Sequence, residues 1–455
     1  MKRISLLSLL LVLVFAACKK DKGGDDPTPD PDPDPPAVSE ADKIKDTTLL
    51  YAKEIYLWYK NIPASFNARQ YADPNEIMEA IRPYSIQTGF AEPVDRWSFA
   101  MSQAEWNDVS GGIAGDIGLG IFFMSNNDLR VSYVEPESAA GKAGVQRTWR
   151  ITSINNSTNI NTSNASINFI VDAIYGGKNA SIRFQKPDGT NVDMSLTPST
   201  YQEQPLLLDT VYSAGGKNVG YFVLNSFLGD TSQMKASFSN LFQRLAAKNV
   251  TDLVVDLRYN GGGYVDLQEE MANYIIPAAS NNKIMYKQQF NDLMPTNWNT
   301  TVTFAKKGTV SPQKVVFIVT HNTASASEAL INCLKPHMDV SVVGPSNSHG
   351  KAVGYFPIEV GDWYILPVSF RLLNSANEGN YFNGFTPDKV VVDGLDKPWG
   401  DLNEDCLASA YKYLTTGAFR AIQREERSDP EMIRSYRTME LPKHKLLIED
   451  RKHLH

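Results

Sequence analysis

Hydrophobic and polar positions recur with different periods along the chain, and the changes of period divide it into regions. From residue 38 to about residue 110, apolar residues recur at helical spacing on one stripe, namely Ile44, Tyr51, Ile55 and Trp58. The segment "ADPNEIMEAI" predicts a second helix, because aspartate and proline precede an apolar stripe. We therefore expect an N-terminal helical domain over 38–110.

Short strands bounded by glycine replace this pattern between residues 111 and 200. Examples are "GLGIFFM", "LRVSYV" and "ASIRFQKPDG", and two short helical segments lie between the strands. This texture predicts a small β-rich domain with two helices.

Strands and helices alternate from residue 205 to residue 417. "VTDLVVDLRYN", "KVVFIVT" and "DVSVVG" are nearly continuous apolar runs, and amphipathic segments such as "MKASFSNLFQRLAAKN" separate them. Strands of this kind form a largely parallel sheet with both faces covered, and such sheets place ligand sites at the carboxyl ends of their strands. The whole chain is thus predicted to be a multidomain α+β protein whose last large domain is α/β.

The chain begins with a targeting pattern. "MKRISLLSLLLVLVFAAC" has a basic start, an apolar run too short to span a bilayer comfortably, and small residues before Cys18. Its end resembles a bacterial lipobox, so we expect a lipoprotein signal peptide over 1–17 and lipidation at Cys18. An ordinary signal peptide is the alternative. Lys19 favours the outer membrane of a bacterial cell envelope and leaves the membrane face open.

Low-complexity and charged segments flank the predicted domains. Residues 18–37 repeat proline and aspartate, a composition that extends the chain and builds no core, so they are predicted to be a tether. Residues 418–455 form a charged tail that is expected to be partly helical, and no function is assigned to it.

Net charge and cysteine usage narrow the possible partners. The formal net charge is −7 and the chain has no long basic stripe, which argues against nucleic acid as a partner. An exported chain meets an oxidising environment, so Cys333 and Cys406 are able to form a disulfide. Two buried free thiols are the alternative.

A run of three glycines follows the strand in "VVDLRYNGGGYVD". Gly261, Gly262 and Gly263 let the backbone turn sharply and expose amide hydrogens before a helix. The lysine and hydroxyl of a phosphate-binding P-loop are missing. An oxyanion hole, which needs only aimed N–H groups, and a plain tight turn both remain open from this motif alone.

"TASASEAL" lies at the equivalent turn after the next strand. Ser325 is placed as a nucleophile, and with Glu328 three residues later it also fits a helix capping box. A serine nucleophile needs a base. Lys351, in "SNSHGKAVGYF", has small and mostly apolar neighbours and no acidic residue nearby in sequence. Removal of water in such a place lowers the pKa of a lysine toward neutrality, although a solvated surface lysine is the simpler interpretation of this loop alone.

The three motifs occur in an order that resembles the carboxy-terminal processing serine peptidases, also called tail-specific proteases. "DLRYNGGG", "TASASE" and "HGKAVG" match the glycine turn, nucleophile segment and lysine loop of that family. The resemblance implies a ClpP/crotonase-like catalytic domain over 205–417 with Ser325 as nucleophile and Lys351 as base. It also implies an oxyanion hole made by the backbone N–H groups of Ala326 and of Gly262 or Gly263.

The same resemblance covers the β-rich domain, which looks like a PDZ domain over 111–200. Its peptide-carboxylate site would be the "GLGI" turn, that is, Gly118, Leu119, Gly120 and Ile121. Two departures matter. The family's "GD" is absent from "AGVQRTWRITSI", and Tyr355 stands where many members place a glutamine that orients the lysine.

The function that the resemblance implies is that of a serine endopeptidase that hydrolyses envelope polypeptides with a Ser–Lys dyad and needs no metal or cofactor. The expected partners are a polypeptide substrate and a membrane, reached through the lipid anchor. A catalytically inactive peptide-binding lipoprotein, or an esterase or amidase on the same fold, are the alternatives.

Overall fold

The computed structural model describes residues 38–420 and 445–449. The chain divides into two units, Met1–Ser39 and Glu40–His455, and the elements below belong to the second. In the described part of the chain, no helix is both long and apolar enough to cross a bilayer.

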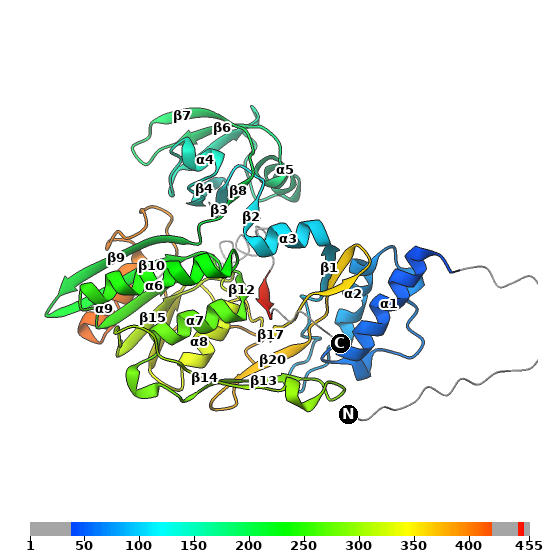
Figure 1. Cartoon of the computed structure of the whole chain (residues 1–455). Helices are drawn as coiled ribbons and strands as arrows, with labels where there is room; N and C mark the ends of the chain where they lie inside the picture. Colours follow the sequence, from blue (N-terminus) through cyan, green and yellow to red (C-terminus); the bar gives the residue numbers. More distant parts are fainter. Residues whose placement is uncertain (1–37, 421–444, 450–455) are drawn as a thin grey trace, which may run out of the picture. The chain divides into compact units, whose positions relative to one another are not determined.

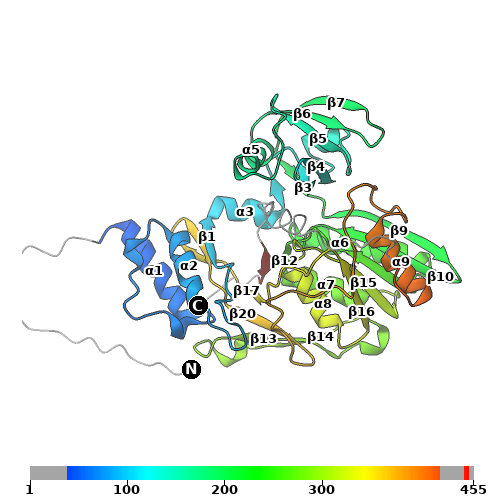
Figure 2. The same ribbon diagram turned by 180° about the vertical axis from the view of Figure 1, so that it is seen from behind.

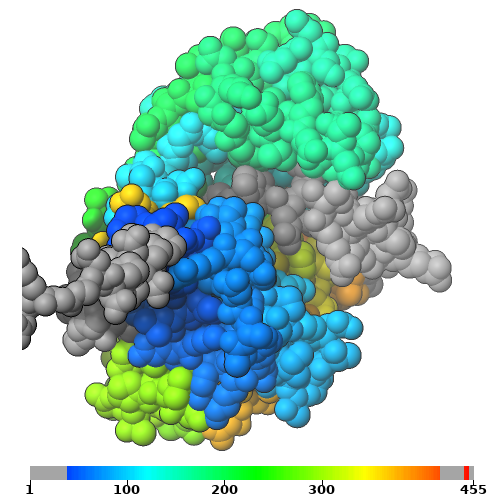
Figure 3. All heavy atoms as spheres, turned by 90° about the vertical axis from the view of Figure 1, so that its right-hand side faces the viewer, coloured from blue at the N-terminus to red at the C-terminus, as the bar shows by residue number. Residues whose placement is uncertain are grey.

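The N-terminal region contains the two predicted helices. These are α1 (Glu40–Ile55) and α2 (Pro74–Ile81) (Figure 1). The Asp73 side chain caps α2 by accepting from the Glu76 N–H, and proline in the first turn suits a helix start. The Asn291 side chain also donates to the carbonyls of Glu54 and Tyr56. In Figure 3 the blue N-terminal region lies against a yellow-green part of the chain.

The sequence pattern predicts a purely helical N-terminal region, and the structure shows that this is wrong, because the region also contains a strand. It continues into β1 (Phe99–Ser102) and α3 (Gln103–Gly111). β1 pairs with β19 (Trp363–Leu366), which pairs with β18 (Ile358–Val360), so the N-terminal region and the α/β region share a three-stranded sheet. Segments far apart in sequence are therefore joined beside the lysine loop.

The β-rich domain is a five-stranded antiparallel sheet with its own apolar core. Its strands, in sheet order, are β3 (Leu119–Ser125), β4 (Asp128–Val134), β5 (Arg150–Ile154), β6 (Ala180–Gln185) and β7 (Asn191–Leu196). Two helices, α4 (Ala139–Lys142) and α5 (Asn164–Tyr175), accompany it. The chain enters and leaves through a small ladder between β2 (Ile113–Ala114) and β8 (Tyr201–Gln202).

The third region is built on a six-stranded sheet. Its order is β21 (Lys389–Val390), β16 (Asp339–Gly344), β15 (Lys314–Ile318), β11 (Asp252–Asp256), β10 (Lys217–Leu224) and β9 (Leu206–Ala214). Every neighbouring pair is parallel except β9 with β10. Alternate side chains of these strands enter two different cores, as expected for a sheet buried on both faces.

Helices cover both faces of this sheet. α6 (Thr231–Ala247), α7 (Val265–Ile275) and α8 (Ala326–Leu334) pack into one core, and α9 (Asp405–Thr416) packs into the other (Figure 2). The glycine turn follows β11 and Ser325 follows β15. Because β11 and β15 are parallel neighbours, their carboxyl ends place these two turns side by side.

Two smaller sheets complete the region. One contains β14 (Thr301–Thr303), β13 (Ile284–Phe290), β20 (Phe370–Asn374) and β17 (Val353–Gly354). The other pairs β12 (Gly262–Tyr264) with β22 (Leu446–Ile448) in parallel.

A buried ion network anchors the end of β11. The Arg258 guanidinium contacts Asp256, Asp393 and Glu404, all of which are buried. Asp393 also accepts from Arg147 of the β-rich domain at 2.8 Å. Because each charge has a partner, the network holds the backbone that leads into the glycine turn without leaving an unpaired buried ion.

Candidate active site

Ser325 lies at the turn between β15 and α8. Its φ is +63°, a region that residues other than glycine rarely adopt. The side chain is fully buried, and its Oγ has no hydrogen-bond partner among the described residues. A strained backbone and an unpaired buried hydroxyl both cost free energy, and such features concentrate at functional sites.

Glu328 connects the nucleophile turn to the lysine loop. Its Oε2 accepts from the backbone N–H groups of Ser325 and Lys351, each at 2.8 Å. Its Oε1 accepts from the Gly350 N–H at 2.6 Å and from the Ser348 hydroxyl at 2.5 Å. Burial raises the pKa of Glu328, and these hydrogen bonds oppose the rise. The capping-box glutamate thus fixes the backbone of Ser325 relative to that of Lys351, because both N–H groups donate to the same carboxylate oxygen.

Lys351 is fully buried, and its amine has few polar neighbours. The Nζ donates to the Val353 carbonyl at 2.7 Å and lies 4.1 Å from the ring centroid of Tyr355 and 5.8 Å from that of Trp97. Burial lowers the pKa of Lys351 to about 7, although the charges of Asp95 and Glu328 act in the opposite direction. A neutral amine is therefore accessible near pH 7, which is what a lysine base requires.

The glycine turn packs directly against the nucleophile. Gly262 has a φ of +101°, and a Cβ added to it would lie 2.8 Å from Ser325 Cβ and 2.9 Å from the Ala326 nitrogen. Gly263 has a φ of +144°, and a Cβ added to it would lie 2.2 Å from the Phe227 carbonyl oxygen. Only glycine fits this approach.

The predicted oxyanion donors have different surroundings. The Gly262 N–H donates to Asn260 Oδ1 at 2.9 Å, so it would have to leave Asn260 or share its hydrogen to bind an oxyanion. Gly263 belongs to the β12–β22 ladder, and Ala326 is the first residue of α8. The Asn260 carbonyl accepts from the Ala324 N–H at 3.0 Å and from Ser327 Oγ at 3.2 Å, which joins the two turns. The assignment of the oxyanion hole stays a prediction.

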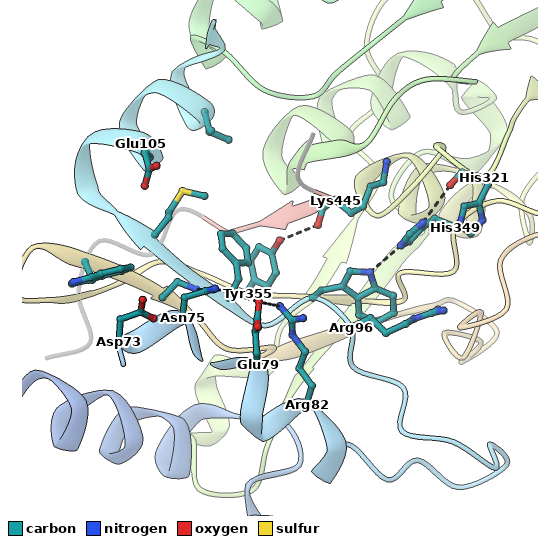
Figure 4. Close-up of a pocket in the computed structure, with 16 residues that line it drawn as sticks. Asp73, Asn75, Glu79, Arg82, Arg96, Glu105, His321, His349, Tyr355 and Lys445 are labelled. Carbon is teal, nitrogen blue, oxygen red and sulfur yellow. Dashed lines mark hydrogen bonds and ion pairs between the residues drawn. The ribbon is translucent and has the colours of Figure 1, made fainter. Parts of the chain in front are cut away.

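Tyr355 contacts Lys351 through its ring face. Its hydroxyl donates to the Lys445 carbonyl at 2.9 Å, as Figure 4 shows, and the role of Tyr355 in orienting the amine stays a prediction. Among the described residues, the amine donates a hydrogen bond to the Val353 carbonyl.

Two family models match this chain. That of peptidase family S41 matches residues 218–391, and that of the peptidase S41 N-terminal domain matches residues 44–99. The chain belongs to peptidase family S41. The matched ranges include the glycine turn, Ser325 and Lys351.

Named relatives of this S41 family member include carboxy-terminal processing proteases. The "Carboxy-terminal processing protease CtpB" of Bacillus subtilis (strain 168) is 27% identical over 259 residues, which are 55% of this chain and 48% of that protein. A "Probable CtpA-like serine protease" of Staphylococcus epidermidis (strain ATCC 12228) is 24% identical over 344 residues, which are 73% and 63% of the two chains. The chain thus spans less than two thirds of the length of either relative.

A solved structure of an S41 protease from Bacteroides fragilis NCTC 9343 shares the fold. Its TM-score is 0.65 at 21% identity, over 81% of this chain and 97% of that one. This likeness supports a mixed α/β multidomain architecture for the family member described here.

A cavity of about 730 Å³ opens beside the lysine loop of this S41 family member (Figure 4). The Trp97 indole, which lines it, donates to His349 Nε2 at 3.0 Å. Its lining combines residues of the N-terminal region with residues of the α/β region, among them Arg82, Arg96, Trp97, Phe99, Met101, His321, His349, Tyr355 and Lys445. In the described ranges, no group of His, Cys, Asp and Glu is arranged to hold a metal ion.

The "GLGI" turn has a mixed environment for the predicted peptide-carboxylate site. The Gly118 N–H donates to Asp116 Oδ1 at 2.7 Å, while the Leu119 and Ile121 side chains pack in the core of the β-rich domain. A Cβ on Gly120 would lie 2.1 Å from the Tyr133 ring. β3, which begins at the second residue of the turn, is one of the two edge strands of its sheet, as strand addition requires.

A pocket of about 320 Å³ adjoins this turn, and Gly118, Leu119, Asp116 and Glu135 are among its lining residues. Three acidic residues line this pocket, Asp116, Glu135 and Glu203, and their charges disfavour an anionic ligand. Carboxylate binding stays a prediction, and this lining argues against it.

The prediction of a Cys333–Cys406 disulfide is wrong, and the alternative of two buried free thiols is confirmed. Cys333 lies on α8, in the core on one face of the six-stranded sheet, and Cys406 lies on α9, in the core on the other face. The sheet separates them. Burial raises the pKa of both thiols, which makes them unreactive.

Sequence reasoning missed several residues of the site. The sequence pattern does not single out Trp97 or neighbouring Asp95 as residues of the site. Asn260 was hidden inside the glycine-turn motif, and Glu328 was assigned only to a helix cap. Each of these residues acts across a contact between segments far apart in sequence, which local patterns do not report.

Two predictions concern the ends of the chain. Cys18, the signal peptide and the tether lie outside the described residues. The tail was expected to be partly helical, whereas its described residues 445–449 contain a strand, β22.

Proposed function

We propose that this S41 family member is a serine endopeptidase of the carboxy-terminal processing type, with Ser325 as nucleophile and Lys351 as general base. One observation carries the proposal. The backbone N–H groups of Ser325 and Lys351 donate to the same Glu328 oxygen, the Lys351 side chain is fully buried with a pKa of about 7, and the buried Ser325 hydroxyl has no partner among the described residues.

Each step uses groups of this chain. The neutral Lys351 amine donates a hydrogen to the Val353 carbonyl and keeps its lone pair for the proton of Ser325 Oγ. As Oγ attacks a peptide carbonyl, the bond from carbon to oxygen forms and the proton moves to Lys351. The oxyanion is stabilised by N–H groups at the start of α8 and in the glycine turn.

The tetrahedral intermediate then loses the amine. Lys351 returns the proton to the leaving nitrogen, and an acyl-enzyme at Ser325 remains. The same amine takes a proton from a water molecule as that water attacks the ester carbon. The bond from the carbon to Oγ then breaks, the new carboxylate leaves, and Lys351 passes the proton to Ser325 Oγ. Only proton transfers and nucleophilic displacements are needed, which matches the residues present.

The test is hydrolysis of an unfolded protein, such as fluorescein-labelled casein, by the full-length chain in detergent. Ser325→Ala and Lys351→Ala are each expected to lower the rate by about 10³-fold or more. Lys306→Ala is the matched control, because burial also lowers the pKa of Lys306, to about 8, and among the described residues its Nζ donates to the Tyr274 and Val310 carbonyls, away from the site. Cleavage that survives both dyad substitutions would show that the dyad is wrong.

We further propose the finer features that the sequence predicts. The α/β region is ClpP/crotonase-like, and the β-rich domain is PDZ-like, with β3 as the edge that accepts a peptide strand. The substrate is an unfolded or exposed envelope polypeptide, and the protein is anchored by a lipid at Cys18, in the outer membrane. Incorporation of labelled palmitate that is lost in Cys18→Ser tests the anchor.

A further inference from the structure

The described tail segment forms a strand beside the nucleophile turn. β22 is paired along one side with β12, with Gly262 opposite Leu446 and Gly263 opposite Leu447, and the Leu446 N–H donates to the Gly261 carbonyl at 3.0 Å. Figures 1 and 2 both show this red strand next to β12. The glycine turn therefore has an extended peptide on its outer edge.

The other side of the tail strand is bonded to Tyr355. The Tyr355 N–H donates to the Leu447 carbonyl at 3.0 Å, and the Glu449 N–H donates to the Tyr355 carbonyl at 3.1 Å. The Tyr355 hydroxyl donates to the Lys445 carbonyl at 2.9 Å. The segment thus lies in a slot with main-chain partners on both sides, one the glycine turn and the other the residue whose ring covers the Lys351 amine.

The slot adjoins the reacting serine. The Leu446 carbonyl oxygen lies 2.2 Å, and Ser325 Cβ 2.8 Å, from the single point that a Cβ on Gly262 would occupy. Only about one carbon atom's width therefore separates the tail backbone from the nucleophile's side chain. A polypeptide substrate that reaches Ser325 beside the glycine turn would need the space that the tail now fills.

The slot also selects side chains. The three apolar residues of the strand each expose at most 1% of their surface, namely Leu446, Leu447 and Ile448. Lys445, at the start of the segment, lines the cavity of about 730 Å³. An extended apolar segment that follows a polar residue suits this site.

We propose that residues 445–449 occupy the groove that holds an extended apolar substrate segment parallel to β12, so that the tail competes with substrate for the active site. This inference rests on the proposed function. It names both the substrate class, an unfolded apolar stretch bound by strand addition, and an internal competitor for it.

The first experiment compares hydrolysis of labelled casein by the full-length chain and by its Leu447→Asp variant. A carboxylate is not tolerated unpaired at a fully buried position, so the tail leaves the slot and the rate at low substrate concentration rises by about tenfold or more. Leu50→Asp, the same substitution at an exposed leucine of α1, is expected to leave the rate unchanged. Equal Ser325-dependent rates for wild type and Leu447→Asp would overturn the tail inference and leave the proposed function intact.

A peptide supplied in trans guards against a folding defect. The peptide KHKLLIEDR, residues 443–451, is expected to return Leu447→Asp to the wild-type rate, whereas the peptide with aspartate at the position of Leu447 is not. Failure of the first peptide to inhibit would contradict the proposal.

Docking is measured separately from turnover in Ser325→Ala. Amides of residues 446–449 are expected to be protected from hydrogen exchange, and excess unfolded casein is expected to remove that protection. Fast exchange without casein would overturn the tail inference whether or not the protein is a peptidase. A further outcome is that Ser325→Ala shows the expected protection and loses it with casein, while Leu447→Asp cleaves no casein. That outcome would overturn the proposed function and leave the tail inference intact.

Discussion

Glu328→Gln tests the idea that one carboxylate sets the geometry of the nucleophile and the base. The carboxylate accepts four hydrogen bonds, two on each oxygen. A glutamine replaces one oxygen with an NH₂ group, so two donors lose their acceptor and face another donor. A hydrogen bond to a charged group contributes about 1.5–3 kcal/mol, and the neutral amide costs less to bury than the carboxylate.

The substitution is expected to destabilise the reactive geometry of Ser325 and Lys351 by about 2–4 kcal/mol. This corresponds to a fall in kcat/KM of about 30- to 1,000-fold. The pH profile should change as well. The charge of Glu328 raises the pKa of Lys351, so its removal should shift the pH midpoint of the residual activity below the wild-type value of about 7. A purely structural defect would lower the rate without moving the midpoint in this direction.

The assay is initial-rate hydrolysis of labelled casein between pH 5.5 and 9, with thermal unfolding recorded for each variant. Glu76→Gln is the matched control, because Glu76 also accepts a backbone N–H before a helix, that of Ala72 at 2.8 Å, but is exposed. If Glu328→Gln loses no more activity than Glu76→Gln, or if its midpoint rises, the role assigned to Glu328 is wrong.

Three further predictions follow from the same geometry. Wild-type kcat/KM should rise with pH through a midpoint near 7, because only the neutral Lys351 amine accepts a proton, and a flat profile from pH 5.5 to 9 would contradict this. Gly262→Ala should abolish measurable casein hydrolysis, because its Cβ would meet Ser325 Cβ and the Ala326 nitrogen as well as the Leu446 carbonyl of the tail, so that release of the tail alone would not relieve the clash. Gly89→Ala, at a φ of +92° with nothing within 4 Å, isolates the effect of backbone strain, and equal rates for the two variants would exclude the contact as the cause. Dithiothreitol should leave the melting temperature unchanged, because Cys333 and Cys406 are free thiols, and a drop on reduction would show that they are bonded.

Much of the α/β region follows from local pattern. The apolar run "DVSVVG" was predicted as a strand and is β16 (Asp339–Gly344), and the stripe in "MKASFSNLFQRLAAKN" lies within α6. These elements are predictable because burial on both faces of a sheet requires continuous apolar residues, and burial of one helix face requires a 3.6-residue period. Ser325 and Lys351 were identified from the order of the three motifs. The sequence did not show that both residues donate a backbone N–H to Glu328, because this contact forms only in the folded chain.

The sequence alone determined the main strands and helices of the α/β region and the residue types of the glycine turn, the nucleophile segment and the lysine loop. Those properties depend on neighbours in the chain, through backbone sterics and the periodicity of burial. The tertiary structure decided which groups surround the Lys351 amine, that β1 pairs with a hairpin more than 250 residues away, that the sheet keeps Cys333 from Cys406, and that a tail strand lies beside Ser325. These contacts join segments with no shared local signal, and the free energy that selects them comes from burial of surfaces that exist only after the chain has folded.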